Sequence, residues 1–538
     1  MFIFVFCATD LSKMSLDSCP RVLVGGTLID GTGAPPINDS IVVINDEYIV
    51  AVGKRDEIPI PEGSEVYDIT GKTIMPGLID SHCHFLWMGV AMKTMVLLND
   101  TENIMDALVR VKKRVSEAKP GEWIIGIGWD ESKWSENRYL NRYDLDAISP
   151  DNPVMLSRVC GHLVVLNSLA LELANITKDT QDDQGGHVDK DESGENTGIL
   201  RDCRYLVMDV MPKASMEIMV DALGMASEHA LSLGCTGIHD AGLGGEEIKS
   251  YQHALSAGKL KVRSYLFQRD DVVDGSIAMG LETGFGNNMI RIGPSKLMMD
   301  GSLGARTAAL FEPYEDEPDT SGLVLEEPDV LLAKVMKAHN NNLQTATHAI
   351  GDLAIEHTLD AIQEALRLNP RKDHRHRIEH CEITSTQQIE RIRNLGVIPD
   401  MQPNFIGEWS GPGSMYRQRL GEKRDRMSNQ YRAMLDEGIK VAFGSDGMPF
   451  NPIYGIWSAV NHPIRQNRIT LEEAIMCYTL NAAYSGFWEE VTGSLESGKL
   501  ADVTVFNDDL TQIPPAEIRD SKCFMTLVNG KILYHAEH

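Results

Sequence analysis

The chain has 538 residues, of which 43% are hydrophobic and 24% are charged. The length predicts more than one domain, and the composition is typical of globular proteins, which excludes the fibrous and intrinsically disordered classes. Lys and Arg total 50 against 78 Asp and Glu, a formal net charge of -28. Such a surface repels phosphate backbones, so we expect no nucleic-acid partner.

The N-terminal residues contain a short apolar run, Met1 to Ala8, with no basic segment before it and no clear cleavage site after it. These features argue against a signal peptide, and we expect a disordered extension over residues 1–19. The chain contains no run of eighteen apolar residues, so we expect no membrane partner. Nine cysteines without a repeated spacing favour reduced thiols and a cytoplasmic location.

Both ends of the chain read as short strands broken by turns. Segments rich in Val and Ile, with Gly, Asp and Asn between them, fill residues 20–75 and 496–538, and Asn529-Gly530 is a strong hairpin signal. Each segment is small for a core of its own. We therefore predict one small β-sandwich domain that is formed from both termini.

Between these ends, apolar strand-like runs alternate with helical patterns over residues 76–495. Eight such runs and the helices between them predict an α/β fold, a parallel (β/α)8 TIM barrel. The runs begin at Leu78, Cys235, Lys261, Ser295, Leu343, His376, Val397 and Lys440. The gap between the first two runs is too long for a single loop. It predicts an insertion with its own structure at approximately 90–225.

Polar residues with metal-binding side chains follow the C-terminal ends of these runs, where barrel active sites lie. His82 and His84 alternate with Cys83, so both imidazoles point the same way. With them we group Lys296, His348, His380 and Asp446. Imidazole and carboxylate are ordinary ligands for Zn²⁺, and Mn²⁺, Fe²⁺, Co²⁺ and Ni²⁺ also suit such a site. A histidine at a strand end is often only a core or surface residue, but the combination predicts a metal centre.

Several segments resemble the metal-dependent amidohydrolase superfamily, namely PGLIDSHCHF, THAIGD, RIEHC and FGSDGMP. The segments KLMMDGSLGARTAAL, GWDESKW and CGHLVVLNSLAL are similar to amidohydrolase family 3, the branch with the N-substituted formamide deformylases. The resemblance implies two metal ions per chain, zinc foremost. His82, His84 and Asp446 would hold one ion, and His348 and His380 the other. Lys296 would bridge them as a carboxylated lysine; the alternative for Lys296 is a plain salt bridge or hydrogen bond.

The same resemblance implies that a metal-activated hydroxide attacks the carbonyl of an amide-type C–N bond. Asp446 would act as general base and then as general acid, and His380 would help to hold the oxyanion. Other residues near the strand ends are candidates for substrate binding, with packing, helix capping or internal pairing as the alternative for each. These residues are Trp87, His162, His239, Asp300, Arg306 and Gln402.

The remaining predictions concern neighbouring residues and rival functions. Cys83 and Cys381 are expected to be buried and inert, whereas His374 and His376, in the charged run RKDHRHR, are expected to be solvated. The substrate is expected to be a small molecule, and the chain's size is compatible with a symmetric homodimer. The rival readings are a mononuclear enzyme, a hydrolase of cyclic amides or esters, and a non-catalytic scaffold.

Overall fold

The computed structural model describes residues 19–159, 163–182, 186–201 and 203–536, and the chain divides into two compact units. The first unit comprises residues 1–85 and 226–538, and the second comprises residues 86–225. Except for Cys19, the extension predicted over residues 1–19 lies outside the described residues.

The first unit contains an eight-stranded parallel sheet in the order β20-β19-β18-β17-β16-β15-β14-β7. This sheet confirms the predicted (β/α)8 barrel, and each strand overlaps one of the eight apolar runs. The strands are β7 (Leu78–Cys83), β14 (Cys235–Leu243), β15 (Arg263–Gln268), β16 (Ile290–Met298), β17 (Thr345–Ala349), β18 (Arg377–His380), β19 (Ile398–Met401) and β20 (Ala442–Phe443).

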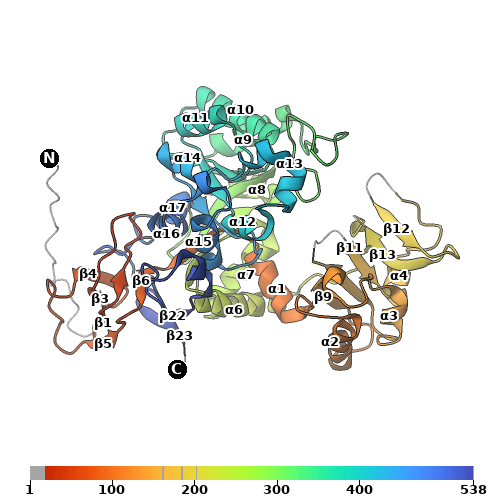
Figure 1. Cartoon of the computed structure of the whole chain (residues 1–538), viewed down its shortest axis with the longest axis horizontal. Helices are drawn as coiled ribbons and strands as arrows, with labels where there is room; N and C mark the ends of the chain where they lie inside the picture. The colour runs from red at the N-terminus through yellow and green to blue at the C-terminus, as the bar shows by residue number, and fades with distance from the viewer. Residues whose placement is uncertain (1–18, 160–162, 183–185, 202, 537–538) are drawn as a thin grey trace. The chain divides into compact units, whose positions relative to one another are not determined.

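Helices connect successive strands, as a parallel sheet requires, and α15 to α17 follow the last strand (Figure 1). They are α6 (Met216–Ser232), α7 (Gly245–Ser256), α8 (Asp270–Ala278), α9 (Pro328–Asn340), α10 (Asp352–Leu368), α11 (Thr386–Leu395), α12 (Pro403–Trp409), α13 (Met415–Asp425), α14 (Tyr431–Asp436), α15 (Pro452–Val460), α16 (Leu471–Tyr478) and α17 (Leu480–Ser485). Among the described residues, no helix combines the length and apolar character needed to cross a bilayer.

The barrel closes where the segment after β20 meets β7. The amides of Ser445 and Asp446 both donate to the carbonyl of His82, over 3.1 and 2.7 Å. The approach is so close that a Cβ on Gly444 would lie 2.4 Å from the amide nitrogen of His82. Only glycine fits this position without displacing the backbone that carries His82 and Asp446.

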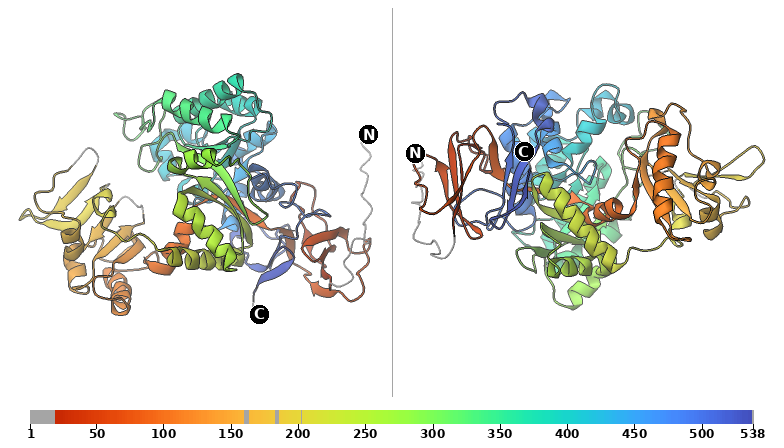
Figure 2. Two further views of the ribbon diagram at one scale, coloured as in Figure 1. Left: turned by 180° about the vertical axis from the view of Figure 1, so that it is seen from behind. Right: turned by 90° about the horizontal axis from the view of Figure 1, so that it is seen from below.

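The two ends of the chain together form a pair of small sheets. One sheet is β4-β3-β1-β5, built from β1 (Arg21–Val24), β3 (Ser40–Asn45), β4 (Tyr48–Lys54) and β5 (Glu65–Asp68). The other is β2-β6-β21-β22-β23, from β2 (Thr27–Leu28), β6 (Thr73–Pro76), β21 (Val503–Phe506), β22 (Cys523–Val528) and β23 (Lys531–His535). N-terminal and C-terminal strands are therefore neighbours in one sheet (Figure 2), which confirms the predicted sandwich.

The second unit has its own six-stranded sheet, β12-β13-β11-β10-β9-β8, with helices packed against it. Its strands are β8 (Val96–Leu97), β9 (Ile124–Trp129), β10 (Val154–Arg158), β11 (Leu163–Leu166), β12 (His187–Lys190) and β13 (Asn196–Arg201). Its helices include α2 (Ile104–Glu117), α3 (Arg142–Asp146), α4 (Ser168–Leu173) and α5 (Tyr205–Met208), after α1 (Phe85–Thr94) at the boundary. Two apolar clusters form its core, so the insertion is a folded body.

The prediction that His374 and His376 are solvated is wrong, because both are buried. The ring of His376 accepts the amide of Thr345 at Nδ1 and lies 2.9 Å from Nδ1 of His339 through Nε2. The charge of the neighbouring Arg375 is compensated within the protein, because Arg375 forms ion pairs with Asp373 and Glu489. The charged run is thus folded against the barrel.

The backbone contact at Gly444 generates a first prediction. Gly444→Ala should lower the free energy of unfolding by about 1–3 kcal/mol, because the added methyl group overpacks the contact with His82. Gly275→Ala is the matched control: a Cβ there meets nothing within 4 Å, and Ala is the better helix former by about 0.5–1 kcal/mol. Denaturant unfolding of both variants measures the difference. Equal stability of the two variants would contradict the close approach.

The buried His376 generates a second prediction. Burial, and then the positive charges of His374, Arg371 and His339, hold the pKa of His376 well below 6.5. The unfolded chain binds a proton at this residue as pH falls through 6.5, and the folded chain does not. The stabilising contribution is therefore complete above pH 6.5 and is lost as pH falls, by about 1.4 kcal/mol per pH unit.

His376→Gln should remove this dependence. The difference in unfolding free energy between wild type and variant should shrink as pH falls from 7 to 5, by at most about 1.4 kcal/mol per pH unit. It should stay nearly constant between pH 7 and pH 8, which serves as the internal control. A difference that does not change with pH would show that folding does not lower the pKa of His376.

Candidate metal centre

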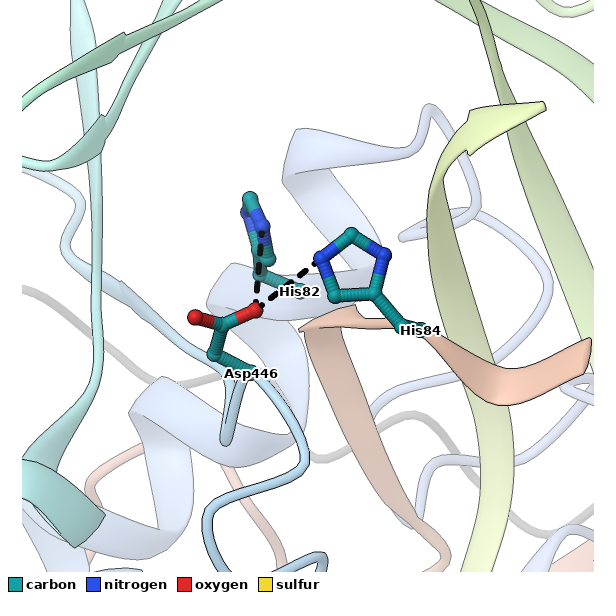
Figure 3. A group of neighbouring side chains, drawn as sticks. All are labelled: His82, His84 and Asp446. Atoms are coloured by element: carbon teal, nitrogen blue, oxygen red, sulfur yellow. Dashed lines mark ion pairs between the residues drawn. The ribbon is translucent and has the colours of Figure 1, made fainter. Parts of the chain in front are cut away.

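Three predicted ligands converge at the point where the barrel closes (Figure 3). His84 Nε2 lies 3.2 Å and His82 Nε2 lies 3.8 Å from the same oxygen, Oδ1 of Asp446. The donor atoms of these three residues all lie within 4.8 Å of one another. His82 is buried, whereas the side chain of His84 is 48% exposed, so the group is accessible from one side.

The other predicted ligands lie beside this group. The ring centroid of His380 is 5.0 Å from that of His82 and 4.3 Å from that of His348. Lys296, on β16, is near enough that its charge lowers the pKa of all three imidazoles. The structure thus brings the six predicted ligands to one end of the barrel.

Two of these residues reach the site only because their backbone is left-handed. His380 has φ +73° and Asp446 has φ +53°, a region that residues with a Cβ rarely adopt. Glu379 and His380 are consecutive, and strict strand alternation would send their side chains to opposite faces. The left-handed turn at His380 lets both act at the same end of the barrel, a strain typical of functional sites.

Each buried imidazole has one ring nitrogen held by the protein. His82 Nδ1 pairs with the carboxylate of Glu379, His380 Nδ1 lies 2.7 Å from Oε1 of Gln402, and His348 Nε2 lies 3.0 Å from the carbonyl of Gly301. Because each partner accepts, the bonded nitrogen carries the proton and the other presents a lone pair. Metal-binding histidines are oriented in this way.

Electrostatics favours neutral imidazoles at the buried His82 and His380, whereas at the more exposed His84 the hydrogen bond with Asp446 outweighs burial and raises the pKa. Burial and then the charge of Lys296 lower the pKa of His82 to about 4. Burial, followed by the charge of His82, lowers the pKa of His380 to about 3. Burial opposes ionisation of Asp446, but its hydrogen bond with His84 prevails and holds the pKa of that carboxyl well below its usual range. Neutral imidazoles and an ionised carboxylate are the donor set that a divalent metal ion requires, so the residues fit such an ion.

Sequence reasoning missed the charged residues below this group. Glu379 and Asp400 lie with His82 in a second cluster of close donor atoms, but the guanidinium of Arg377 is 2.8 Å from Glu379 and 2.7 Å from Asp400. Arg377 therefore already pairs with both carboxylates of the second cluster. Arg377 and Glu379 alternate in the run RIEH, a spacing that could have placed both on one face of the strand.

Three residues predicted to bind substrate have partners within the protein. Gln402 accepts from His380. His239 is buried inside β14, where its Nδ1 lies 3.0 Å from Arg377. The carboxylate of Asp300 accepts the amides of Ala309, Ile350 and Gly351 over 2.8–3.0 Å.

The remaining candidates differ in their surroundings. Arg306 forms ion pairs with Asp316 and Glu317 over 2.9 and 3.1 Å. Trp87 lies on α1 and is 43% exposed. His162 lies outside the described residues. Cys83 and Cys381 are both buried, as expected.

Comparisons with known proteins identify the family to which the chain belongs. A model of the amidohydrolase family matches residues 65–534. YtcJ of Bacillus subtilis strain 168, named as an amidohydrolase, is 32% identical over 92% of this chain and 95% of its own length. The N-substituted formamide deformylase of Arthrobacter pascens is 27% identical, over 92% and 94%. The crystal structure of an uncharacterized metal-dependent hydrolase from Pyrococcus furiosus superposes with a TM-score of 0.75 at 30% identity, covering 93% of this chain and all of that one.

The environment of Asp300 generates a third prediction. An amide at this position places an NH2 group against backbone N–H donors, so Asp300→Asn should lower the free energy of unfolding by about 1–3 kcal/mol. Asp316→Asn, at a carboxylate paired with Arg306 and Arg419 nearer the surface, should cost less than about 1 kcal/mol. Denaturant unfolding compares them. If Asp300→Asn keeps its full stability and loses only substrate affinity, the prediction is contradicted and Asp300 is a substrate-binding residue.

Proposed function

The chain belongs to the amidohydrolase family and is a metal-dependent hydrolase of carbon–nitrogen bonds, and from this premise we propose that it cleaves a linear or N-substituted amide. The observation that carries the proposal is the grouping of His82, His84 and Asp446, whose donor atoms lie within 4.8 Å of one another, with the ring of His380 5.0 Å from that of His82. The resemblance to a deformylase of N-substituted formamides supports this substrate class.

We further propose that the site holds two divalent ions, zinc foremost. His82, His84 and Asp446 would hold one ion, and His348 and His380 the other. Lys296 would join them as a carbamate. Burial lowers the pKa of Lys296, which favours the unprotonated amine, the form that can add CO2. When bound, the ions polarise the amide carbonyl and lower the pKa of water.

Asp446 is the residue best suited to move the proton. Its ionised carboxylate lies between two imidazoles at the accessible side of the group. In the proposed reaction a water oxygen bonds to the amide carbon, and Asp446 accepts the proton that this water releases. Asp446 then donates that proton to the amide nitrogen as the C–N bond breaks. The products are a carboxylate, or formate, and an amine.

His380 is better suited to act as a metal ligand than as a hydrogen-bond donor to the oxyanion. Its Nδ1 proton is engaged by Gln402, and its low pKa keeps the other nitrogen unprotonated. That nitrogen can donate electrons to a cation, but it has no proton to offer an oxyanion. We therefore assign His380 to metal binding and leave stabilisation of the oxyanion to the ions themselves.

Metal content generates the fourth prediction. Elemental analysis of protein purified without chelators should find two divalent ions per chain, and Lys296→Ala should reduce this to one or fewer. Lys440→Ala is the control, because this lysine lies over the ring of Tyr484 and not among the ligands. Hydrolysis should then be assayed by amine formation from N-substituted formamides, other linear amides and lactams, and by acid formation from esters.

The outcomes separate the rival readings. Two ions and turnover of linear amides support the proposal. One ion in the wild type would contradict the bridging role of Lys296, and turnover confined to lactams or esters would contradict the substrate class. Less than one ion, with no recovery after metal is added, would overturn the mechanism.

A further inference from the structure

Glu379 is fully buried directly beneath the metal centre and contacts His82. Its Oε2 pairs with His82 Nδ1. Both carboxylate oxygens also accept from Arg377, over 2.8 Å from Nε and 2.9 Å from Nη2. Neither side chain is exposed. A bidentate pair of this kind fixes the plane of the carboxylate as well as its position.

Arg377 is itself immobilised by further contacts. Its Nη2 donates to the carbonyl of Ser81 over 2.8 Å and lies 2.7 Å from Asp400, and its guanidinium lies over the ring of Phe267, 4.7 Å from the centroid. Ser81 directly precedes His82. Arg377 therefore contacts both the backbone next to His82 and the carboxylate that pairs with the ring of His82. These contacts fix the position of the carboxylate relative to the ring.

We propose that Glu379, locked by Arg377, is a positioning residue that keeps the proton of His82 on Nδ1 and directs Nε2 toward the metal ion. The inference rests on the proposed metal-dependent function and extends it to a residue outside the ligand set. An anionic acceptor at Nδ1 also makes the imidazole a stronger electron donor at Nε2. His82 should consequently be the ligand that dominates metal affinity.

The other buried imidazoles provide an internal comparison. His380 is oriented by the amide oxygen of Gln402 and His348 by the carbonyl of Gly301. Both of these partners are neutral. His348 Nε2 also lies 3.5 Å from Oδ1 of Asp300, a longer contact than the one with Gly301. For His82 the carboxylate of Glu379 is itself the hydrogen-bond partner, and His82 lies next to Asp446 at the closure of the barrel. The difference in partner charge predicts unequal contributions to binding.

A purely structural role for Glu379 is the competing explanation, since a buried arginine needs a counter-charge. The pair of Arg263 and Asp502 offers a matched case. Its Nη2 to Oδ1 distance is 2.9 Å, both side chains are 1% exposed, and Asp502 also accepts from Thr492 and the amide of Asn529. None of these partners of Asp502 is a histidine. Loss of either buried carboxylate should destabilise the fold, but only one should weaken metal binding.

The fifth prediction compares Glu379→Gln with Asp502→Asn. A glutamine has one acceptor oxygen instead of two, and its NH2 group would oppose either Arg377 or the Nδ1 proton of His82. The favoured response is a shift of that proton to Nε2, which blocks the ligand nitrogen. Competition for Zn²⁺ with a fluorescent chelator should show a Kd raised roughly 10- to 100-fold in Glu379→Gln. Asp502→Asn should bind Zn²⁺ like the wild type, and thermal unfolding of the metal-free proteins should show both destabilised.

The outcomes distinguish this inference from the function on which it rests. A wild type that binds no Zn²⁺ would overturn both. A wild type that binds Zn²⁺, with the same Kd in Glu379→Gln and a lowered melting temperature, would leave the function standing and reduce Glu379 to a counter-charge. If Glu379→Gln does not fold, Glu379→Asp decides: it keeps the charge beside Arg377 but is one methylene shorter. A weaker Kd in that variant supports the positioning role, and an unchanged Kd overturns it.

Discussion

The meeting of β7 with the segment after β20 is the constraint on which the site depends. Two backbone amides converge on the carbonyl of His82, and Gly444 lets the chains approach to this distance. One of these amides belongs to Asp446. The contact that closes the barrel therefore also sets the position of the shared carboxylate relative to the first two imidazoles, and a loss of closure would be a loss of the centre.

Closure of the barrel also buries ionisable side chains, and burial determines their protonation states. Imidazoles enclosed in this way stay neutral, as ligands must, whereas carboxylates survive as anions only beside a cation or a hydrogen-bond donor. The pKa of Asp80, which accepts the amide of Ser445, is raised to about 7 by burial. Glu379 stays ionised, because Arg377 and His82 outweigh the cost of burial. Glu379 and Arg377 thus form a buried ion pair next to the metal-binding residue His82.

The sequence allowed the eight strands and the order of the ligands to be predicted, because parallel strands are buried on both faces and are followed by polar residues at one end. The alternation of Arg377 and Glu379 in RIEH is compatible with one face of the strand, but nothing in the sequence indicates that the pair is buried or that Glu379 contacts His82. The error at His374 and His376 has a related cause. The run RKDHRHR looks solvated unless the distant Glu489, which pairs with Arg375, is already in place.

The residues predicted to bind substrate show that a polar residue at a strand end can have either of two roles: it can contact substrate, or it can support another residue of the site. Gln402, His239 and Asp300 use their polar atoms to hold a ligand, an internal arginine and three loop amides, respectively. Their partners come from other strands and loops, so no local pattern distinguishes a support from a contact. Beside these engaged groups, the ring of Phe405 lies parallel to His380, 6.1 Å between centroids. Asp446 and the ring nitrogens of His82 and His84 contact one another, and these are the polar atoms suited to bind a cation and move one proton.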